Sequence, residues 1–366
     1  MIVDLLEVSE EDLAVVSALT ASVFNRVSHP RDTARLRWML FANPDADEHI
    51  PKGWVLRSRG ETVGFLGNVL RRLSFCGKDH VIAFTSDFVV TPEYRFHGLK
   101  LAKAFFDQGQ LDYVACSTGN RNSIPVLRRL GACQIAGADE AALFVLNPAA
   151  IASYYLEKKA HGSAFAHAVL PRVLGAASWF KRRLWAESEG SHAIEVRGVA
   201  RFDDDVDDLY ERSHPPDKVT SCRDSMRLNW LFVDGPIDRP CTKIRSAYRD
   251  GKLCGYVVTQ DRKLGKARLE YRGVRDVFCA LDDRLTFAAL ARHLVQECLE
   301  DGMDCLEFEN IPAVLISQLA SHGAWRRRLA VNPFLLCSKG EDATLLPEKA
   351  EMWYLVNSDG DGGGWQ

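Results

Sequence analysis

The residues whose types and spacing could do chemistry gather around one predicted strand, turn and helix. Residues 80–90, HVIAFTSDFVV, are rich in β-branched and aromatic residues and predict a strand. The turn TPEYRFHG follows at residues 91–98, and the apolar periodicity of LKLAKAFFDQ predicts a helix from Leu99 onward. Converging backbone N–H groups and the helix dipole make such a helix N-terminus an anion site. Arg95 adds a positive charge, and Gly98 would allow either a close backbone approach or a positive φ.

Taken alone, these residues also fit an ordinary structural turn, but a second strand and turn follow them. DYVACSTG at residues 112–119 predicts a strand, and the next segment, NRNSIPVLRRLGA, carries Asn120 and, eleven residues later, Gly131. Together the two segments resemble the GNAT superfamily of acyl-CoA acyltransferases. In that family a strand ending V-x-P-x-Y/F-R-x-x-G precedes a helix, a strand and N-x-x-A-x-x-L-Y-x-x-x-G-F. The matching residues are Val90, Pro92, Tyr94, Arg95, Gly98, Asn120 and Gly131, and the strong resemblance covers about residues 55–135.

The resemblance implies acetyl-CoA as the acyl donor and no metal. In the family the turn amides hold the CoA pyrophosphate, and the pantetheine arm pairs with the first strand where two neighbouring strands separate. His97 and Lys100 are expected to meet phosphate. The cofactor-binding residues implied in this way are Val89, Val90, Arg95, Phe96, His97, Gly98, Leu99, Lys100 and Asn120.

The match departs from the family at the position of the leaving group. Leu127 replaces the family's tyrosine, Ser123 its alanine, and Ala132 its final aromatic residue, while Lys100 replaces a second small residue after the glycine. In many GNAT enzymes that tyrosine is thought to protonate the leaving thiolate, so the role is unfilled here or passes to another group. A CoA thiol, with a pKa near roughly 8.5, needs such an acid less than an alkoxide would. Further candidate donors to the oxyanion or the acceptor are Cys116, Ser117 and Thr118.

Two side chains are candidates for the base that an ammonium needs before it attacks a thioester. Asp87 lies just before the strand segment expected to pair with pantetheine, and it could take the proton directly or through a water. The alternative is a structural aspartate at a strand end, and the recurrence of Asp276 in the second half favours that alternative. His29 lies in VSHPR before the second helix, and a histidine pKa near neutrality suits a base. A similar Ser-His-Pro at His214 leaves a structural role for His29 open.

The elements that must position these residues occur twice in the chain. DTARLRWMLFANP at residues 32–44 recurs as DSMRLNWLFVDGP at residues 224–236. Further matched landmarks, all at offsets of 189 to 192, are Gly60–Phe65 with Gly251–Tyr256, Asp87 with Asp276, Asn120 with Asn310, and Gly131 with Gly323. We therefore predict an α/β (α+β) fold of two tandem GNAT-like domains. Each is expected to be a twisted, mixed, mainly antiparallel sheet flanked by helices.

The second copy lacks the residues of the anion site. Where the first half has PEYRFHG, residues 280–287 read ALDDRLTF, without a glycine, and Asp282 and Asp283 would repel a pyrophosphate. We predict one CoA site per chain and a second half that shapes the acceptor pocket. The predicted domains are residues 1–147 with the CoA site, a helical connector at residues 148–190, and a degenerate copy without a CoA site at residues 191–366.

Composition excludes several classes of function. A net charge of −3 offers no electrostatic footprint for nucleic acid. The ten cysteines never form a CxxC pair, which favours free thiols in the cytoplasm over a metal or disulfide framework. Neither a signal-peptide pattern nor an apolar run long enough for a membrane span is present. The polar, glycine-rich Asp359–Trp365 predicts a partly mobile C-terminal segment.

The predicted function is an acetyl-CoA-dependent N-acyltransferase acting on a small-molecule amine by direct transfer. Its layout resembles tandem enzymes that acetylate an amino sugar linked to a nucleotide, but no acceptor motif is present. A non-catalytic acyl-CoA sensor or scaffold is one alternative, motivated by the missing tyrosine and the degenerate second half. A FemABX-like aminoacyl transferase that uses charged tRNA is another, although such proteins usually lack the CoA turn found here. The acceptor, the acyl chain length and the oligomeric state stay open.

Overall fold

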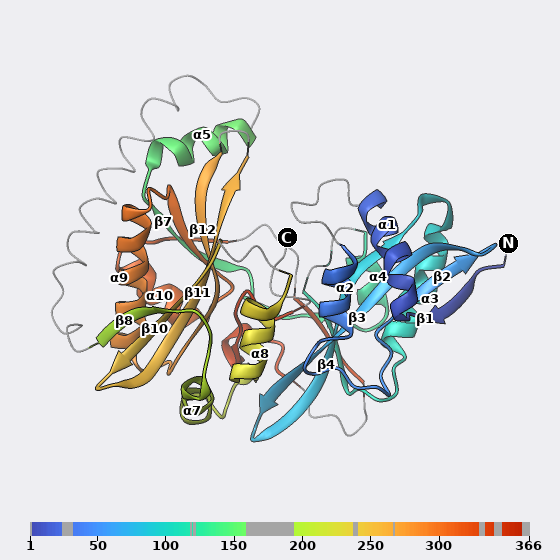
Figure 1. Ribbon diagram of the computed structural model, residues 1–366, viewed down its shortest axis with the longest axis horizontal. Helices are drawn as coiled ribbons and strands as arrows, with labels where there is room; N and C mark the ends of the chain where they lie inside the picture. The colour runs from blue at the N-terminus through green and yellow to red at the C-terminus, as the bar shows by residue number, and fades with distance from the viewer. Residues whose placement is uncertain are drawn as a thin grey trace.

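The computed structural model describes residues 2–23, 32–117, 119, 122–158, 194–236, 241–265, 268–328, 334–339 and 346–360. Within these ranges the strands form a nine-stranded and a seven-stranded sheet, which lie side by side with helices packed on them (Figure 1). Both sheets are mixed and mainly antiparallel, so the predicted fold class is confirmed. No helix in the described part of the chain is long and apolar enough to cross a bilayer.

The first sheet carries the segment singled out by the sequence. Its strands in spatial order are β1 (Asp4–Glu7), β2 (Gly53–Ser58), β3 (Glu61–Phe75), β4 (Lys78–Val90), β5 (Tyr113–Cys116), β15 (Leu335–Ser338) and β6 (Cys133–Gln134). Off this path, β9 (Val219–Ser221) pairs with β3, and β16 (Trp353–Tyr354) pairs with β9. β4 and β5 run parallel, as the predicted strand–helix–strand unit requires.

Helices cover both faces of the first sheet. One face packs against α1 (Leu13–Val23) and α2 (Thr33–Leu40), and the other against α3 (Gly98–Phe106) and α4 (Ile124–Arg129). The residues of α3 that face the sheet are apolar and fully or nearly buried, namely Leu101, Ala102, Phe105 and Phe106. This packing fixes the N-terminus of α3 at the end of β4.

The second sheet repeats the arrangement. Its strands in spatial order are β14 (Trp325–Arg328), β7 (Glu140–Val145), β13 (Cys305–Glu309), β12 (Leu269–Cys279), β11 (Lys252–Leu264), β10 (Thr242–Arg249) and β8 (Ile194–Val199). The helices around it are α5 (Pro148–Lys158), α7 (Asp204–Ser213), α8 (Ser225–Asn229), α9 (Arg284–Glu300) and α10 (Ala313–Ser321). Figure 1 shows α9 on the outer side of this sheet and α5 over one end of β11 and β12.

The two halves exchange strands. β7 precedes residue 147 in the chain but pairs with β13, Phe144 lying opposite Leu306. β15 comes from the second half but pairs with β5, Leu336 lying opposite Ala115. Each exchanged strand covers a sheet edge that would otherwise present unpaired backbone groups. The domain boundary predicted at residue 147 divides the chain between the two repeats. Each sheet nevertheless contains strands from both sides of that boundary.

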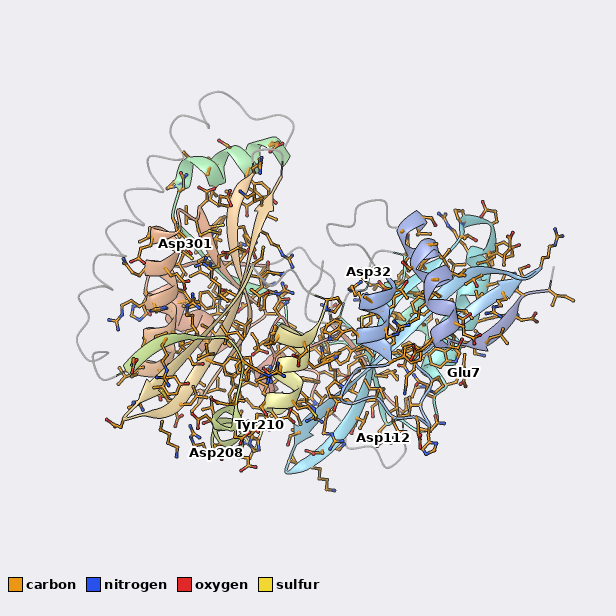
Figure 2. All side chains as sticks on the ribbon, viewed as in Figure 1. Glu7, Asp32, Asp112, Asp208, Tyr210 and Asp301 are labelled. Atoms are coloured by element: carbon orange, nitrogen blue, oxygen red, sulfur yellow. The ribbon has the colours of Figure 1, made fainter. Side chains whose placement is uncertain are left out.

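The internal repeat is visible at the level of strand register. Gly64 pairs with Val90 in the first sheet, and Gly255 pairs with Cys279 in the second. Asp32 and Asp224 cap α2 and α8 in the same way, each accepting a bond from the backbone N–H three residues later at 2.8 Å (Figure 2 labels Asp32). Residues matched by sequence therefore occupy matching places.

A tryptophan pair, with one residue from each copy of the repeat, joins the two halves. The rings of Trp38 and Trp230 stack with centroids 4.6 Å apart. Each indole N–H donates to the other residue's carbonyl, at 3.0 Å and 3.2 Å. The reciprocal bonds satisfy both buried polar groups, so the interface between the halves is specific as well as apolar.

Candidate functional site

The first-half turn has the form that the sequence predicted. β4 ends at Val90, a short 3-10 helix covers Pro92–His97, and α3 begins at Gly98. Gly98 has a φ of −57°, so the positive-φ alternative is wrong. A Cβ at Gly98 would meet the Val90 side chain at 3.4 Å, an ordinary contact. A small residue is therefore compatible with the protein's own packing, and close approach of a ligand is the remaining reason for a glycine.

The side chains around this turn divide into exposed and engaged groups. Arg95 is exposed, and Phe96 is 96% exposed, so both border an open surface. Lys100 instead donates from Nζ to the Val3 carbonyl at 2.9 Å and ties α3 to the N-terminal segment. Its predicted contact with phosphate would therefore have to come from its backbone N–H, which lies in the first turn of α3. His97 is half-buried with its ring 6.3 Å from that of Tyr94.

The pairing of β4 with β5 ends before the turn, and we call the stretch of β4 beyond the last pair the opening between β4 and β5. The two strands pair only from Ile82 with Tyr113 to Phe84 with Ala115. β5 ends at Cys116, whereas β4 continues to Val90 while paired with β3 on its other side. The part of β4 that contains Val89 and Val90 therefore lies beyond the last β5 pair, where an extended ligand could add as a strand.

Asp87 lies at an irregularity in β4. The β3–β4 register shifts between Phe65 and Gly67, opposite this residue, and Asp87 has a φ of 51°. Its side chain is only 2% exposed, and Arg35 Nη1 from α2 lies 3.9 Å from Oδ2. A non-glycine residue in the left-handed region of a strand carries strain of order 1–3 kcal/mol, and such strain clusters at functional sites.

The equivalent Asp276 has a different environment. It is buried in a closed network in which Arg223 Nε lies at 3.4 Å, Tyr256 donates at 3.2 Å, and Ser358 donates to the other carboxylate oxygen. Burial raises the pKa of Asp276 above its ordinary value. It is not among the residues with positive φ. The recurrence of an aspartate favoured a structural role for Asp87. In the structure, however, the backbone and the surroundings of Asp276 differ from those of Asp87.

The chain's C-terminal segment reaches the end of β5. Arg71 Nε donates to the Gly360 carbonyl at 3.2 Å, and a Cβ at Gly360, where φ is 144°, would overlap the Ser117 hydroxyl. Asp359 accepts two bonds from the buried Arg223 at 3.0 Å and 3.1 Å. Buried guanidinium groups thus bind Asp359 and Gly360, the first two residues of the segment predicted to be partly mobile. Residues 361–366 lie outside the described residues.

In the second half a carboxylate of the chain itself occupies the helix N-terminus. α9 begins at Arg284, and Asp283 caps it by accepting from Thr286 N at 3.1 Å. Arg249 Nη2 donates to the same carboxylate at 2.9 Å. Burial raises the pKa of Asp283, but the bonds from Arg249 and Thr286 outweigh it and lower the pKa below its ordinary value. The position that an anion would take in the first half is thus filled by negative charge.

Some predicted residues cannot be placed. His29, Thr118 and Asn120 lie outside the described residues. Leu127, which stands where the family has its tyrosine, is buried in α4 and offers no proton. Sequence reasoning missed Arg71, Arg223 and the end of the chain, because their contacts join segments with no motif in common.

A buried carboxyl in the second sheet gives the protein a predicted pH response. Burial, followed by the negative charge of Glu309, raises the pKa of Glu307 to about 7, although Arg327 opposes this. The folded state then binds the proton more tightly than the unfolded chain. The resulting stability is fully present below the unfolded pKa, near 4.5, and is lost as pH rises through 7.

Between about pH 6 and 8 the free energy of unfolding should therefore fall by about 1 kcal/mol through this group. Glu307→Gln, which keeps an acceptor for Arg327, should remove that part of the slope in urea unfolding curves. Glu270→Gln, at a partly exposed residue of the same sheet, is the matched control and should keep it. Equal slopes for wild type and Glu307→Gln would contradict the assignment.

No protein-family model and no curated protein matches the sequence. Among solved structures, a conserved Enterococcus faecalis protein described as a probable N-acyltransferase is 12% identical with a TM-score of 0.62, covering 92% of this chain and 72% of its own. A GCN5-related N-acetyltransferase from Anabaena variabilis is 11% identical with a TM-score of 0.60 and the same coverage.

A third similar structure is Saccharomyces cerevisiae N-myristoyltransferase with bound myristoyl-CoA. It is 12% identical with a TM-score of 0.54, and the match covers 92% of this chain and 79% of the yeast chain. Structural similarity at identities this low shows the fold and does not identify the acceptor. The two repeated sheets and these similarities agree: the chain has the tandem fold of the GNAT N-acyltransferases.

Proposed function

We propose that the chain is an acyl-CoA-dependent N-acyltransferase that uses acetyl-CoA and acts on a small-molecule amine. The observation that carries this proposal is the β4–turn–α3 unit beside the opening between β4 and β5. Three features meet there: an exposed arginine, a helix N-terminus, and a glycine that the protein's own packing does not require. Among the described residues, the equivalent helix of the second copy, α9, does not combine these features, because the Asp283 carboxylate caps its N-terminus.

The proposed roles follow the order of the chain. Backbone N–H groups from Arg95 to Lys100 bind the pyrophosphate, and Val89 and Val90 pair with the pantetheine arm. Asp87 takes a proton from the acceptor ammonium, directly or through a water. The amine nitrogen then forms a bond to the thioester carbon, the carbon–sulfur bond breaks, and the thiolate leaves with the electron pair. The nitrogen loses a second proton as it becomes an amide, and the thiolate takes up that proton. His29 remains the second candidate for the base.

The second half completes the site by supplying walls. Gly360 packs against Ser117 at the end of β5, and Arg71 bonds the Gly360 carbonyl. Pockets form preferentially at such junctions between domains. We therefore propose one CoA site in the first copy and an acceptor pocket to which the second copy contributes. An amino sugar linked to a nucleotide is one small-molecule amine that could be the acceptor in this proposal.

A non-catalytic acyl-CoA sensor is the second candidate. It is favoured by the buried Leu127 in place of the tyrosine that serves as acid in many GNAT enzymes. A sensor would bind acetyl-CoA without releasing free CoA in the presence of any member of a broad amine panel. Release of the CoA thiol in the presence of one class of amine, measured by thiol titration, would show that the protein is an enzyme.

The CoA turn is tested by Gly98→Asp. The new carboxylate would stand at the N-terminus of α3 and oppose the pyrophosphate by both bulk and charge. Calorimetry should show acetyl-CoA affinity lowered tenfold or more, at least ~1.4 kcal/mol. Gly98→Ala is the control for folding, because φ is −57° and the added Cβ makes an ordinary contact with Val90, and it should weaken acetyl-CoA binding less than Gly98→Asp does because it adds bulk without charge. Two equivalent CoA sites per chain, or an unchanged affinity in Gly98→Asp, would refute the assignment.

A further inference from the structure

The second copy has an opening of the same kind as the first. β12 pairs with β13 only as far as Val274, and β12 itself continues to Cys279. We call this stretch of β12 beyond the last pair the second opening. Cys279 corresponds to Val90 at the offset of 189 that also relates Asp276 to Asp87. The positions that border the opening of the first copy can therefore be located in the second.

A segment of the chain itself lies in the second opening. We call residues 353–360, WYLVNSDG, the closing segment. The Tyr354 hydroxyl accepts from the Cys279 N–H at 3.1 Å and donates to the Cys279 carbonyl at 3.2 Å. Asn357 Nδ2 donates to Glu309, the last residue of β13, at 3.2 Å. The closing segment therefore bonds both of the strands that border the second opening.

These bonds fall on the two positions to which substrates are assigned in the first copy. There, the backbone of Val90 is proposed to pair with the pantetheine arm, and Asp87 is proposed to take the proton of the acceptor. In the second copy Tyr354 bonds the backbone at the place of Val90. The Ser358 hydroxyl donates to Asp276, at the place of Asp87. One short segment thus occupies the positions that two substrates are proposed to occupy in the first copy.

Buried charge keeps the closing segment in place. Arg223, whose side chain is 1% exposed, donates from Nη2 to both carboxylate oxygens of Asp359 at 3.0 Å and 3.1 Å. Its Nε lies 3.4 Å from Asp276, so the closing segment and β12 share one guanidinium group. Removing one partner from a buried ion pair is strongly destabilising, because the remaining charge has lost its water as well. Release of the closing segment from the second opening is therefore unfavourable.

The last residue of the closing segment lies at the proposed site of the first copy. Gly360 follows Ser358 by two residues, and two residues of chain span at most about 7 Å. Arg71 Nε from β3 donates to the Gly360 carbonyl at 3.2 Å. A Cβ on Gly360 would overlap the hydroxyl of Ser117, the residue after β5. A short, bonded stretch of chain therefore joins the second opening to the end of β5.

We propose that the second copy binds the closing segment in place of substrates and thereby fixes one wall of the acceptor pocket in the first copy. This inference rests on the proposed function and assigns Tyr354 and Ser358 as positioning residues, which act on the acceptor through the place of Gly360. It also gives Asp276 a role in a copy whose helix N-terminus is capped by Asp283. A loosened closing segment would weaken acceptor binding and leave the CoA turn unchanged.

The test removes one hydroxyl at a time from the closing segment of the 366-residue chain. Tyr354→Phe keeps the ring packed against Phe278, and Ser358→Ala removes the donor to Asp276. In either variant, amide hydrogen exchange of residues 353–360 should become about tenfold faster. KM for the amine that gives the wild type its highest rate should rise about fivefold, while kcat and acetyl-CoA affinity stay within about twofold. Ser358→Thr keeps a hydroxyl and should lie closer to the wild type than Ser358→Ala does.

Tyr248→Phe is the matched control, because Tyr248 is a buried tyrosine of β10, which β11 separates from β12. It should change neither the exchange of the closing segment nor KM. Urea unfolding shows whether each variant folds, and Ser358→Ala alone decides the outcome if Tyr354→Phe does not fold.

Unchanged exchange of the closing segment, or faster exchange with an unchanged KM, would overturn the inference while acetyl-CoA binding and turnover by the wild type remain intact. A wild type that binds no acetyl-CoA, or that turns over no amine, would refute the proposed function and the positioning role with it. The two failures are therefore distinguishable.

Discussion

Asp87→Asn is expected to lower turnover by roughly 10²–10⁴ while the affinity for acetyl-CoA stays within a few fold. Asparagine keeps the size of the side chain and tolerates the left-handed backbone that Asp87 adopts at a φ of 51°. It cannot accept the proton that the acceptor ammonium must lose. The change therefore removes the base and leaves the fold and the CoA turn in place.

The measurement is steady-state release of the CoA thiol across pH, with CoA affinity measured separately. Loss of a base should also remove the acidic limb of the pH–rate profile. Asp87→Glu is the conservative variant and should recover part of the rate, because it restores a carboxylate at the same position. Activity within a few fold of wild type in Asp87→Asn would transfer the role to His29 or to bulk water. Asp87 would then be a structural residue paired with Arg35.

A chain cut after residue 190 is expected not to form a folded, soluble protein. It would lose β15 from beside β5 and β9 from beside β3, so both strands would expose edges. It would also keep β7 without β13 and β14, the strands on either side of it. The apolar surface of Trp38 would lose Trp230 as well. Aggregation during expression, or a circular dichroism spectrum without a cooperative transition, is the expected observation.

Co-expression of residues 1–190 and 191–366 as two chains is the matched control. Because each half supplies strands to the other's sheet, the two chains should be insoluble alone and should purify together as one complex. That complex should bind one acetyl-CoA. A soluble fragment of residues 1–190 that unfolds cooperatively and turns over the natural acceptor would show that the second half is an independent module. The shared acceptor pocket would then be refuted.

The sequence by itself determined the repeated architecture. The matched Asp-x-x-Arg-Leu-x-Trp segments predicted two copies, and the structure places Asp32 and Asp224 at equivalent helix starts. The strand, turn and helix around Gly98 were also readable, because each depends on local composition, apolar periodicity and the conformational needs of a turn. Local signals such as these survive in a single sequence.

Long-range contacts were decided only by the tertiary structure. Nothing local to residues 140–145 distinguishes a strand of the first sheet from one of the second, since either sheet would bury the same apolar residues. The sequence predicted that Lys100 meets phosphate, whereas in the structure its side chain donates to the Val3 carbonyl. The bonds from Arg223 to Asp359 likewise join segments far apart in the chain. Pattern and spacing specify elements, whereas the pairing of buried charges between elements exists only once the two sheets have packed together.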